Sequence, residues 1–162
     1  MPDLTPLATS VGALLKERKQ DIAVADSSCG GLISASLLSI PGASTYYVGG
    51  VVSYTGVSRV ALLGISEEDM AKAGMRASTE PYAALIAKTV REKFGATWAI
   101  SETGASGPTG NRYGDASGHA CFAVSGPVER TITVETGSTD REANMWAFTK
   151  AALELLETCL KE

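Results

Sequence analysis

The chain has 162 residues, of which 44% are hydrophobic and 20% charged, and its net charge is -4. This length suits one domain, which we take to span residues 1–162. No cluster of Lys and Arg points to nucleic acid, and no apolar run reaches the roughly 20 residues of a membrane span. Residues 1–19 lack the basic and apolar blocks of a secretion signal, so we expect a cytoplasmic protein.

Cysteine and histidine are scarce and scattered. Cys29, Cys121 and Cys159 form no CxxC pair, and His119 is the single histidine. This pattern argues against a disulfide framework, a zinc site or a multi-histidine metal centre. We therefore expect reduced thiols, no metal and no cofactor.

The hydrophobic pattern predicts helices and strands that alternate through the first two-thirds of the chain. Leu4, Leu7 and Val11 recur at helical spacing, and Ser66 with Asp69 resembles a capping box. In chain order, we expect a helix over residues 4–18, a strand over 21–25, a helix over 31–40, a strand over 46–54, helices over 66–74 and 80–94, strands over 97–101, 118–124 and 130–135, and a helix over 140–160.

This order predicts a three-layer α/β/α sandwich with a mixed sheet. The last two strands form a hairpin. Residues 102–117 are rich in glycine and are predicted to form one long loop. A loop of this length inside a compact domain usually has a function.

Two glycine-rich corners follow predicted strands, at residues 26–31 (DSSCGG) and 102–108 (ETGASGP). Ligands of open α/β sheets bind at the carboxyl ends of strands. A helix that begins at Gly30 or Gly31 would direct free N–H groups toward a phosphate or an oxyanion there. The alternative is a local turn in which Ser27 caps the helix.

A serine nucleophile at this corner needs a base. His119 follows the long loop and is one candidate; the alternative is a strand histidine whose hydrogen bonds are satisfied within the fold. Tyr54, with Arg59 five residues further on, is the other candidate.

Five short motifs occur in an order that resembles a known family. They are residues 25–32 (ADSSCGGL), 40–44 (IPGAS), 49–54 (GGVVSY), 63–65 (LGI) and 103–108 (TGASGP). Over nearly its whole length the chain resembles the CinA C-terminal domain family. That family includes amidases that hydrolyse nicotinamide mononucleotide to nicotinic acid mononucleotide and ammonia. The resemblance implies a three-layer sandwich with a mixed sheet, the stand-alone form of the domain and a homo-oligomer.

The family motif AESCTGG reads ADSSCGG in this chain. Ser27 matches the serine that is the nucleophile of the amidases. Cys29 replaces a threonine that lies next to the substrate, and Gly30 and Gly31 match the two glycines. The resemblance therefore implies that these three residues contact the substrate. A thiol is a weak hydrogen-bonding group, so Cys29 would change how the ligand is held.

The second family motif, TYSNxxK, reads SYTGVSR. Tyr54 is retained, but Arg59 replaces the lysine that supports the serine in the amidases. An arginine stays protonated and cannot accept the proton of Ser27. Three outcomes stay open. Tyr54 is the base, with Arg59 favouring its phenolate; His119 or Asp26 is the base; or the chain binds a nucleotide-like ligand and catalyses nothing.

The third family motif, TGIAGPxGG, reads TGASGPTG at residues 103–110. The resemblance implies that this loop, which follows the strand predicted over residues 97–101, contacts the substrate. The residues in question are Thr103, Gly104, Ala105, Ser106 and Gly107. The fourth motif, GDRxxxR, matches at Asp140 and Arg141, whereas Met145 replaces its second arginine and leaves one positive charge fewer for a phosphate. Arg76 would either compensate for that charge or be a solvated arginine.

The resemblance favours an amidohydrolase with Ser27, Tyr54 and Arg59 as its catalytic residues and nicotinamide mononucleotide as its substrate. Two alternatives remain: an amidase for a different, non-phosphorylated amide, and a nucleotide- or small-ligand-binding module without catalysis. We expect a small-molecule amide or nucleotide as the partner, and neither nucleic acid nor a membrane.

Overall fold

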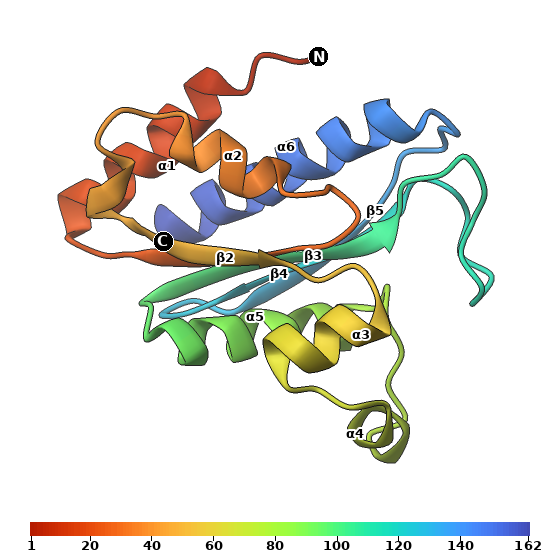
Figure 1. The fold of residues 1–162 in the computed structure, drawn as a ribbon. Helices are drawn as coiled ribbons and strands as arrows, with labels where there is room; N and C mark the ends of the chain where they lie inside the picture. The colour runs from red at the N-terminus through yellow and green to blue at the C-terminus, as the bar shows by residue number, and fades with distance from the viewer.

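The computed structural model describes residues 1–162 and contains one five-stranded mixed sheet (Figure 1). The strands are β1 (Ile22–Asp26), β2 (Tyr47–Val52), β3 (Trp98–Ala105), β4 (His119–Ser125) and β5 (Arg130–Glu135). Their order across the sheet is β2-β1-β3-β4-β5. β1 is parallel to β2 and β3, and β3, β4 and β5 are antiparallel. The carboxyl ends of β1, β2 and β3 therefore meet at one edge of the sheet.

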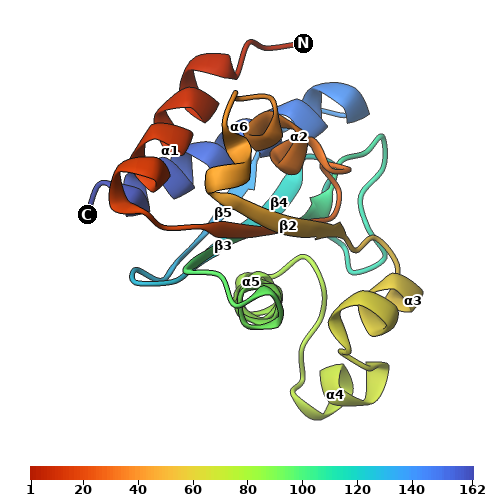
Figure 2. The same ribbon diagram turned by 60° about the vertical axis from the view of Figure 1, so that its left-hand side comes forward.

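Helices cover both faces of the sheet, which confirms the predicted α/β/α sandwich (Figures 1 and 2). One face carries α1 (Thr5–Arg18), α2 (Leu32–Leu38) and α6 (Arg141–Leu160), and the other carries α5 (Glu80–Phe94). Beside α5, a smaller group of turns follows β2. It consists of α3 (Gly56–Ser58), the π-helical turn η2 (Arg59–Leu63) and α4 (Glu67–Lys72). A short 3-10 turn, η1 (Ala43–Thr45), precedes β2.

Two hydrophobic clusters hold the layers together. The larger one lies between the sheet and α1, α2 and α6, and it includes Trp98, Phe122 and Phe148. The cluster between the sheet and α5 uses small side chains, such as Ala25 and Ala99, against the helix. Small residues on this face allow α5 to pack close to the strands.

Most predicted elements agree with the structure to within two residues at each end, and three points of difference bear on the site. β3 continues to Ala105, so the first four residues of the predicted loop belong to a strand paired with β4. At Gly104, a Cβ would lie 2.5 Å from the carbonyl oxygen of His119, so this close pairing requires glycine. α2 begins at Leu32 because Gly30 and Gly31 have positive φ angles of 68° and 92°. The turns α3 and η2 were not predicted.

None of the helices combines the length and the apolar character that crossing a membrane requires.

Candidate active site

Three hydroxyl side chains lie where β1, β2 and β3 end. Along a strand, every second side chain faces the same side of the sheet. In β1, Ala23 and Ala25 pack toward α5, so Ser27 continues that face. By the same alternation Ser53 follows Val51 after β2, and Thr103 lies in β3. Because β1 lies between β2 and β3, Ser27 is the central hydroxyl of the three.

These hydroxyls line a cavity of about 400 Å³ on the α5 side of the sheet edge. Its wall combines the strand ends with the α3 turn, the segment before α5 and the loop between β3 and β4. The lining residues are Ser27, Ser53, Tyr54, Thr55, Gly56, Arg59, Glu67, Ala77, Ser78, Tyr82, Thr103, Gly104, Asn111, Arg112 and Tyr113.

Glu102 is completely buried directly behind the Ser27 corner. Its carboxylate accepts hydrogen bonds from the backbone N–H of Ser27 at 3.1 Å and of Cys29 at 2.9 Å, and from the hydroxyl of Ser28. Burial raises the pKa of Glu102, although the hydrogen bonds from Ser28 and Cys29 act in the opposite direction. Glu102 therefore fixes the corner that presents Ser27.

Cys29 does not line the cavity, contrary to the expectation from its motif that it contacts the substrate. Its side chain is fully buried, with Sγ 3.1 Å from Asp26 Oδ1 and 3.0 Å from Glu102 Oε2. Burial, together with the two nearby carboxylates, raises the pKa of the Cys29 thiol well above its ordinary value. The thiol is a structural donor between two acids and is not an activated nucleophile.

Asp26 is also directed away from the cavity. Its carboxylate accepts hydrogen bonds from the Ser34 hydroxyl at 2.9 Å and from the backbone N–H groups of Ile33 and Ser34 in α2. Burial raises its pKa, against the effect of these hydrogen bonds. Asp26 is buried on the α2 side of the sheet and is not placed to take a proton from Ser27.

Most N–H groups at the predicted anion site, the start of α2, have partners within the protein. This helix has only seven residues, and its first N–H groups are engaged by Asp26. Within the corner, the N–H of Cys29 donates to Glu102, and the N–H of Gly30 donates to the carbonyl oxygen of Ser27 at 3.0 Å. These groups are not free for a ligand, and Gly31 has the left-handed conformation that starts the helix.

Arg59 is nearly buried in the cavity wall and is paired within the protein. Its guanidinium forms an ion pair with Glu67, and its Nε donates to the carbonyl oxygen of Ile65 at 3.2 Å. Burial alone would lower the pKa of Arg59, but the hydrogen bonds and charges of Glu67 and Tyr82 raise it overall. Arg59 is therefore a permanent cation whose charge is balanced by Glu67.

Tyr54 contacts a different arginine from the one that the sequence suggested. Arg141 donates one hydrogen bond to the Tyr54 hydroxyl oxygen at 3.0 Å and another to the carbonyl oxygen of Gly107 at 2.6 Å. It thereby ties Tyr54 to the loop after β3. A guanidinium at the phenol oxygen stabilises negative charge that develops there.

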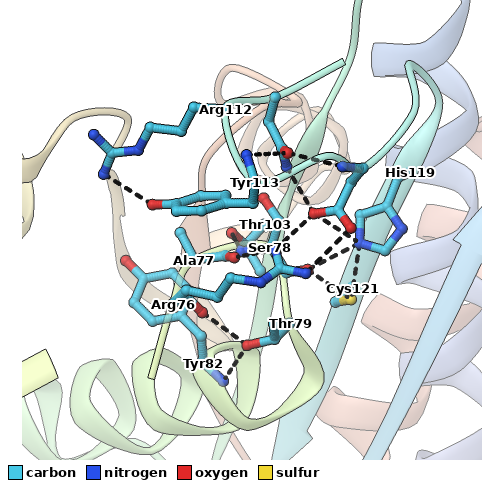
Figure 3. A network of polar contacts seen from close by, with 12 residues as sticks. Arg76, Ala77, Ser78, Thr79, Tyr82, Thr103, Arg112, Tyr113, His119 and Cys121 are labelled. Atoms are coloured by element: carbon cyan, nitrogen blue, oxygen red, sulfur yellow. Dashed lines mark hydrogen bonds and ion pairs between the residues drawn. The ribbon is translucent and has the colours of Figure 1, made fainter. Parts of the chain in front are cut away.

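An ion pair fastens the glycine-rich loop to the wall of the cavity (Figure 3). The Arg76 guanidinium contacts both carboxylate oxygens of Asp115, at 2.6 and 3.2 Å, and lies 5.0 Å from the ring centroid of Tyr113. Arg76 is therefore not a free charge for a ligand, whereas the expectation of a solvated arginine holds in part, because 39% of its side chain is exposed. Its role is to hold the loop that carries Tyr113.

His119 is a structural histidine. Its Nε2 lies 2.9 Å from the carbonyl oxygen of Ser78 (Figure 3). Its Nδ1 contacts the Glu135 carboxylate. Burial alone would lower the pKa of His119, but the hydrogen bonds to Glu135 and Ser78 and the charge of Asp115 raise it overall. Both ring nitrogens are engaged, so His119 is not the base for Ser27.

The structure separates the sequence-predicted site residues into two groups. Ser27, Tyr54, Arg59, Thr103 and Gly104 line the cavity. The others lie outside its lining: Cys29, Gly30, Gly31, Ala105, Ser106, Gly107 and Arg141.

In this second group, three consecutive residues accept hydrogen bonds from other parts of the fold through their backbone carbonyl oxygens. The Ala105 carbonyl oxygen accepts from Gly118, that of Ser106 from Asn144 and that of Gly107 from Arg141. Their carbonyl groups therefore shape the loop after β3 and do not line the cavity.

Several cavity residues were not predicted. The sequence contained a signal for Ser53. It lies two positions after Val51, so its side chain is expected on the same face of the sheet as those of Val51 and Ala25. Glu67, Ser78, Tyr82, Asn111, Arg112 and Tyr113 come from segments whose position only the folded chain determines. No three His, Cys, Asp or Glu side chains gather in a way that could hold a metal ion.

Comparison with known proteins identifies relatives over almost the whole chain. Residues 4–160 match the model of the CinA C-terminal domain. The chain is 36% identical to a CinA-like protein of Chlorobium limicola, covering 98% of this chain and 38% of that protein. It is 35% identical to a CinA-like protein of Gloeobacter violaceus, covering 95% and 36%. The chain thus spans little more than a third of the length of these relatives.

Solved structures share the fold. A CinA superfamily protein from Klebsiella pneumoniae superposes with a TM-score of 0.90 at 24% identity, covering 99% of both chains. The competence/damage-inducible protein CihA from Agrobacterium tumefaciens gives a TM-score of 0.87 at 25% identity, covering 100% of this chain and 98% of that one.

Proposed function

Because the chain belongs to the CinA C-terminal domain family, we propose that it is an amidohydrolase that uses Ser27 as its nucleophile. The observation that carries the proposal is the position of Ser27. Its hydroxyl is the central one of three at the carboxyl ends of adjacent strands, and it lines a polar cavity large enough for a small molecule. The default substrate is nicotinamide mononucleotide.

The chemistry needs two covalent steps. Ser27 Oγ attacks the carboxamide carbon and loses its proton, and the tetrahedral intermediate expels ammonia, which gains a proton. The resulting ester on Ser27 is then attacked by water, which releases the carboxylic acid and restores the hydroxyl. The balance is one amide and one water consumed, and one acid and one ammonia formed.

Tyr54 is the residue that we propose for proton transfer. Of the bases suggested by the sequence, Asp26 faces α2 and His119 is engaged by Ser78 and Glu135, whereas Tyr54 lines the cavity with Ser27. As Tyr54 accepts the proton of Ser27, it gives its own phenolic proton to the departing nitrogen, and the bond from Arg141 holds the Tyr54 oxygen in place for this transfer. Arg59 contributes a fixed positive charge balanced by Glu67.

The direct test is ammonia release from nicotinamide mononucleotide and from a panel of small carboxamides. We expect one molecule of ammonia to be released for each molecule of carboxylic acid formed. A wild-type chain that produces neither product from any of these amides would rule out the amidohydrolase proposal.

Arg112 is expected to make the enzyme prefer anionic substrates. Among the lining residues it is the cation without a carboxylate partner, because Arg59 is paired with Glu67. We expect Arg112→Gln to raise the KM for nicotinamide mononucleotide about 10-fold, the size of one charge-assisted hydrogen bond. The KM for the phosphate-free riboside, which lacks the anionic group, should not rise.

Arg112→Lys is the control, since it keeps the charge. Equal effects of Arg112→Gln on both substrates would contradict recognition of an anionic group. Equal wild-type rates with both substrates would instead favour a phosphate-free amide as the natural substrate.

A second candidate function is a ligand-binding module without catalysis. The observation in its favour is Arg59, which stays protonated beside Glu67 where the family's amidases have a lysine. On this alternative, the wild-type chain binds nicotinamide mononucleotide without turnover, and Arg59→Lys gains measurable ammonia release. Calorimetric titration alongside the ammonia assay distinguishes the two functions.

A further inference from the structure

Ser53 has a buried hydroxyl with no partner in the protein. The residue is only 6% exposed, and its Oγ forms no hydrogen bond. Buried polar groups in native proteins are almost always hydrogen-bonded, so such an atom calls for an explanation. Because Ser53 belongs to the cavity lining, a bound molecule is the natural source of the missing partner.

The position of Ser53 puts this hydroxyl next to the proposed nucleophile. Its backbone N–H donates to the carbonyl oxygen of Asp26 at 2.9 Å, which continues the pairing of Val52 with Asp26. Ser53 is thus the neighbour of Ser27 across two parallel strands. Such strands lie about 4.8 Å apart, so one small functional group can contact both side chains.

Several other polar groups near Ser27 have partners within the protein. Thr103 Oγ1 has a partner within the protein, because it accepts a hydrogen bond from the backbone N–H of Ser78 at 3.1 Å. The N–H groups of Cys29 and Gly30 donate within the corner. Ser53 is therefore the hydroxyl beside Ser27 that has no hydrogen-bond partner within the protein.

We propose that Ser53 is a further catalytic residue, whose hydroxyl donates a hydrogen bond to the carboxamide oxygen of the substrate. The inference rests on the proposed function and adds the group that stabilises the oxyanion. As Ser27 attacks, the carbonyl oxygen becomes negative, and the bond from Ser53 strengthens. No proton is transferred by Ser53 in this step, and its hydroxyl is unchanged at the end of the reaction.

The test compares Ser53→Ala with Ser101→Ala. We expect Ser53→Ala to lower kcat about 100-fold with little change in KM, since the bond is strongest in the transition state. Its melting temperature should equal or exceed that of the wild type, because no protein hydrogen bond is lost. Ser101 is equally buried but donates to the Ala83 carbonyl oxygen at 2.7 Å, so Ser101→Ala should lower stability and leave kcat unchanged.

The outcomes separate this inference from the proposed function. Turnover in the wild type with an unchanged kcat in Ser53→Ala would overturn the role of Ser53 and leave the amidase proposal intact. If the wild type binds nicotinamide mononucleotide without turnover, a Ser53→Ala variant that binds several-fold more weakly supports a carboxamide contact, and equal binding refutes it. If the wild type neither binds nor hydrolyses any amide of the panel, both proposals fail.

Discussion

Replacing Ser27 with alanine is expected to reduce ammonia release on the order of 10⁴-fold or more, because no second nucleophile faces the cavity at this corner. Ser28 is buried and donates its hydroxyl to Glu102, and the Cys29 thiol lies between two carboxylates. The measurement is kcat for nicotinamide mononucleotide, followed by ammonia release.

The fold should survive this substitution. The bonds that hold Ser27 in place involve its backbone N–H, which donates to Glu102, and its carbonyl oxygen, which accepts from Gly30. We therefore expect the Ser27→Ala variant to unfold at the same urea concentration as the wild type. Ser28→Ala is the neighbouring control and should keep measurable turnover. Activity that persists in Ser27→Ala at the wild-type rate would contradict the assignment of the nucleophile.

The largest effect on stability is expected at Glu102. Glu102→Ala would leave the N–H groups of Ser27 and Cys29 and the hydroxyl of Ser28 without their buried acceptor. We expect the free energy of unfolding to fall by about 3–5 kcal/mol. Urea denaturation followed by circular dichroism measures this change.

Glu102→Gln is the matched control, because it keeps one acceptor oxygen and nearly the same volume. It should cost about 1–2 kcal/mol of unfolding free energy. If Glu102→Ala were as stable as the wild type, the corner would not depend on this carboxylate. Its bonds would then be replaceable by other contacts.

Glu102 should also give the protein a measurable pH dependence of stability. Burial raises its pKa above the ordinary value of 4.5, so the folded chain retains a proton that the unfolded chain loses. Its contribution to the unfolding free energy is therefore fully present below pH 4.5 and decreases as the pH rises toward the raised pKa.

Other groups have opposite shifts, such as Asp115, whose pKa is lowered first of all by the hydrogen bond from Arg76. The useful quantity is therefore the difference in unfolding free energy between the wild type and Glu102→Gln. Asp26, whose pKa is also raised by burial, is present in both proteins, so the difference reports on Glu102 together with its charge coupling to Asp26. The unfolding free energy of the wild type should fall relative to that of Glu102→Gln as the pH increases above about 4.5, and a flat difference would contradict a raised pKa at Glu102.

The amino-acid sequence by itself determined the layers and the general location of the site. Hydrophobic periodicity and capping residues are local properties, so they predicted the range of α5 (Glu80–Phe94) without error and the capping box of Ser66 and Asp69 in α4. The DSSCGG corner was expected to lie at the carboxyl end of a buried strand, and β1 ends there. The ordered motifs identified the family.

Only the tertiary structure decided which side chains face the cavity. One residue of difference along a strand reverses the direction of a side chain, so Ser27 faces α5 while Asp26 faces α2. The pairing of β3 with β4 extended a strand into the predicted loop and placed Glu102 behind the corner. The partners of charged groups are equally non-local: Arg59 with Glu67, and Arg141 with Tyr54 across 87 positions. Such contacts depend on how distant segments pack, which no local pattern in the sequence contains.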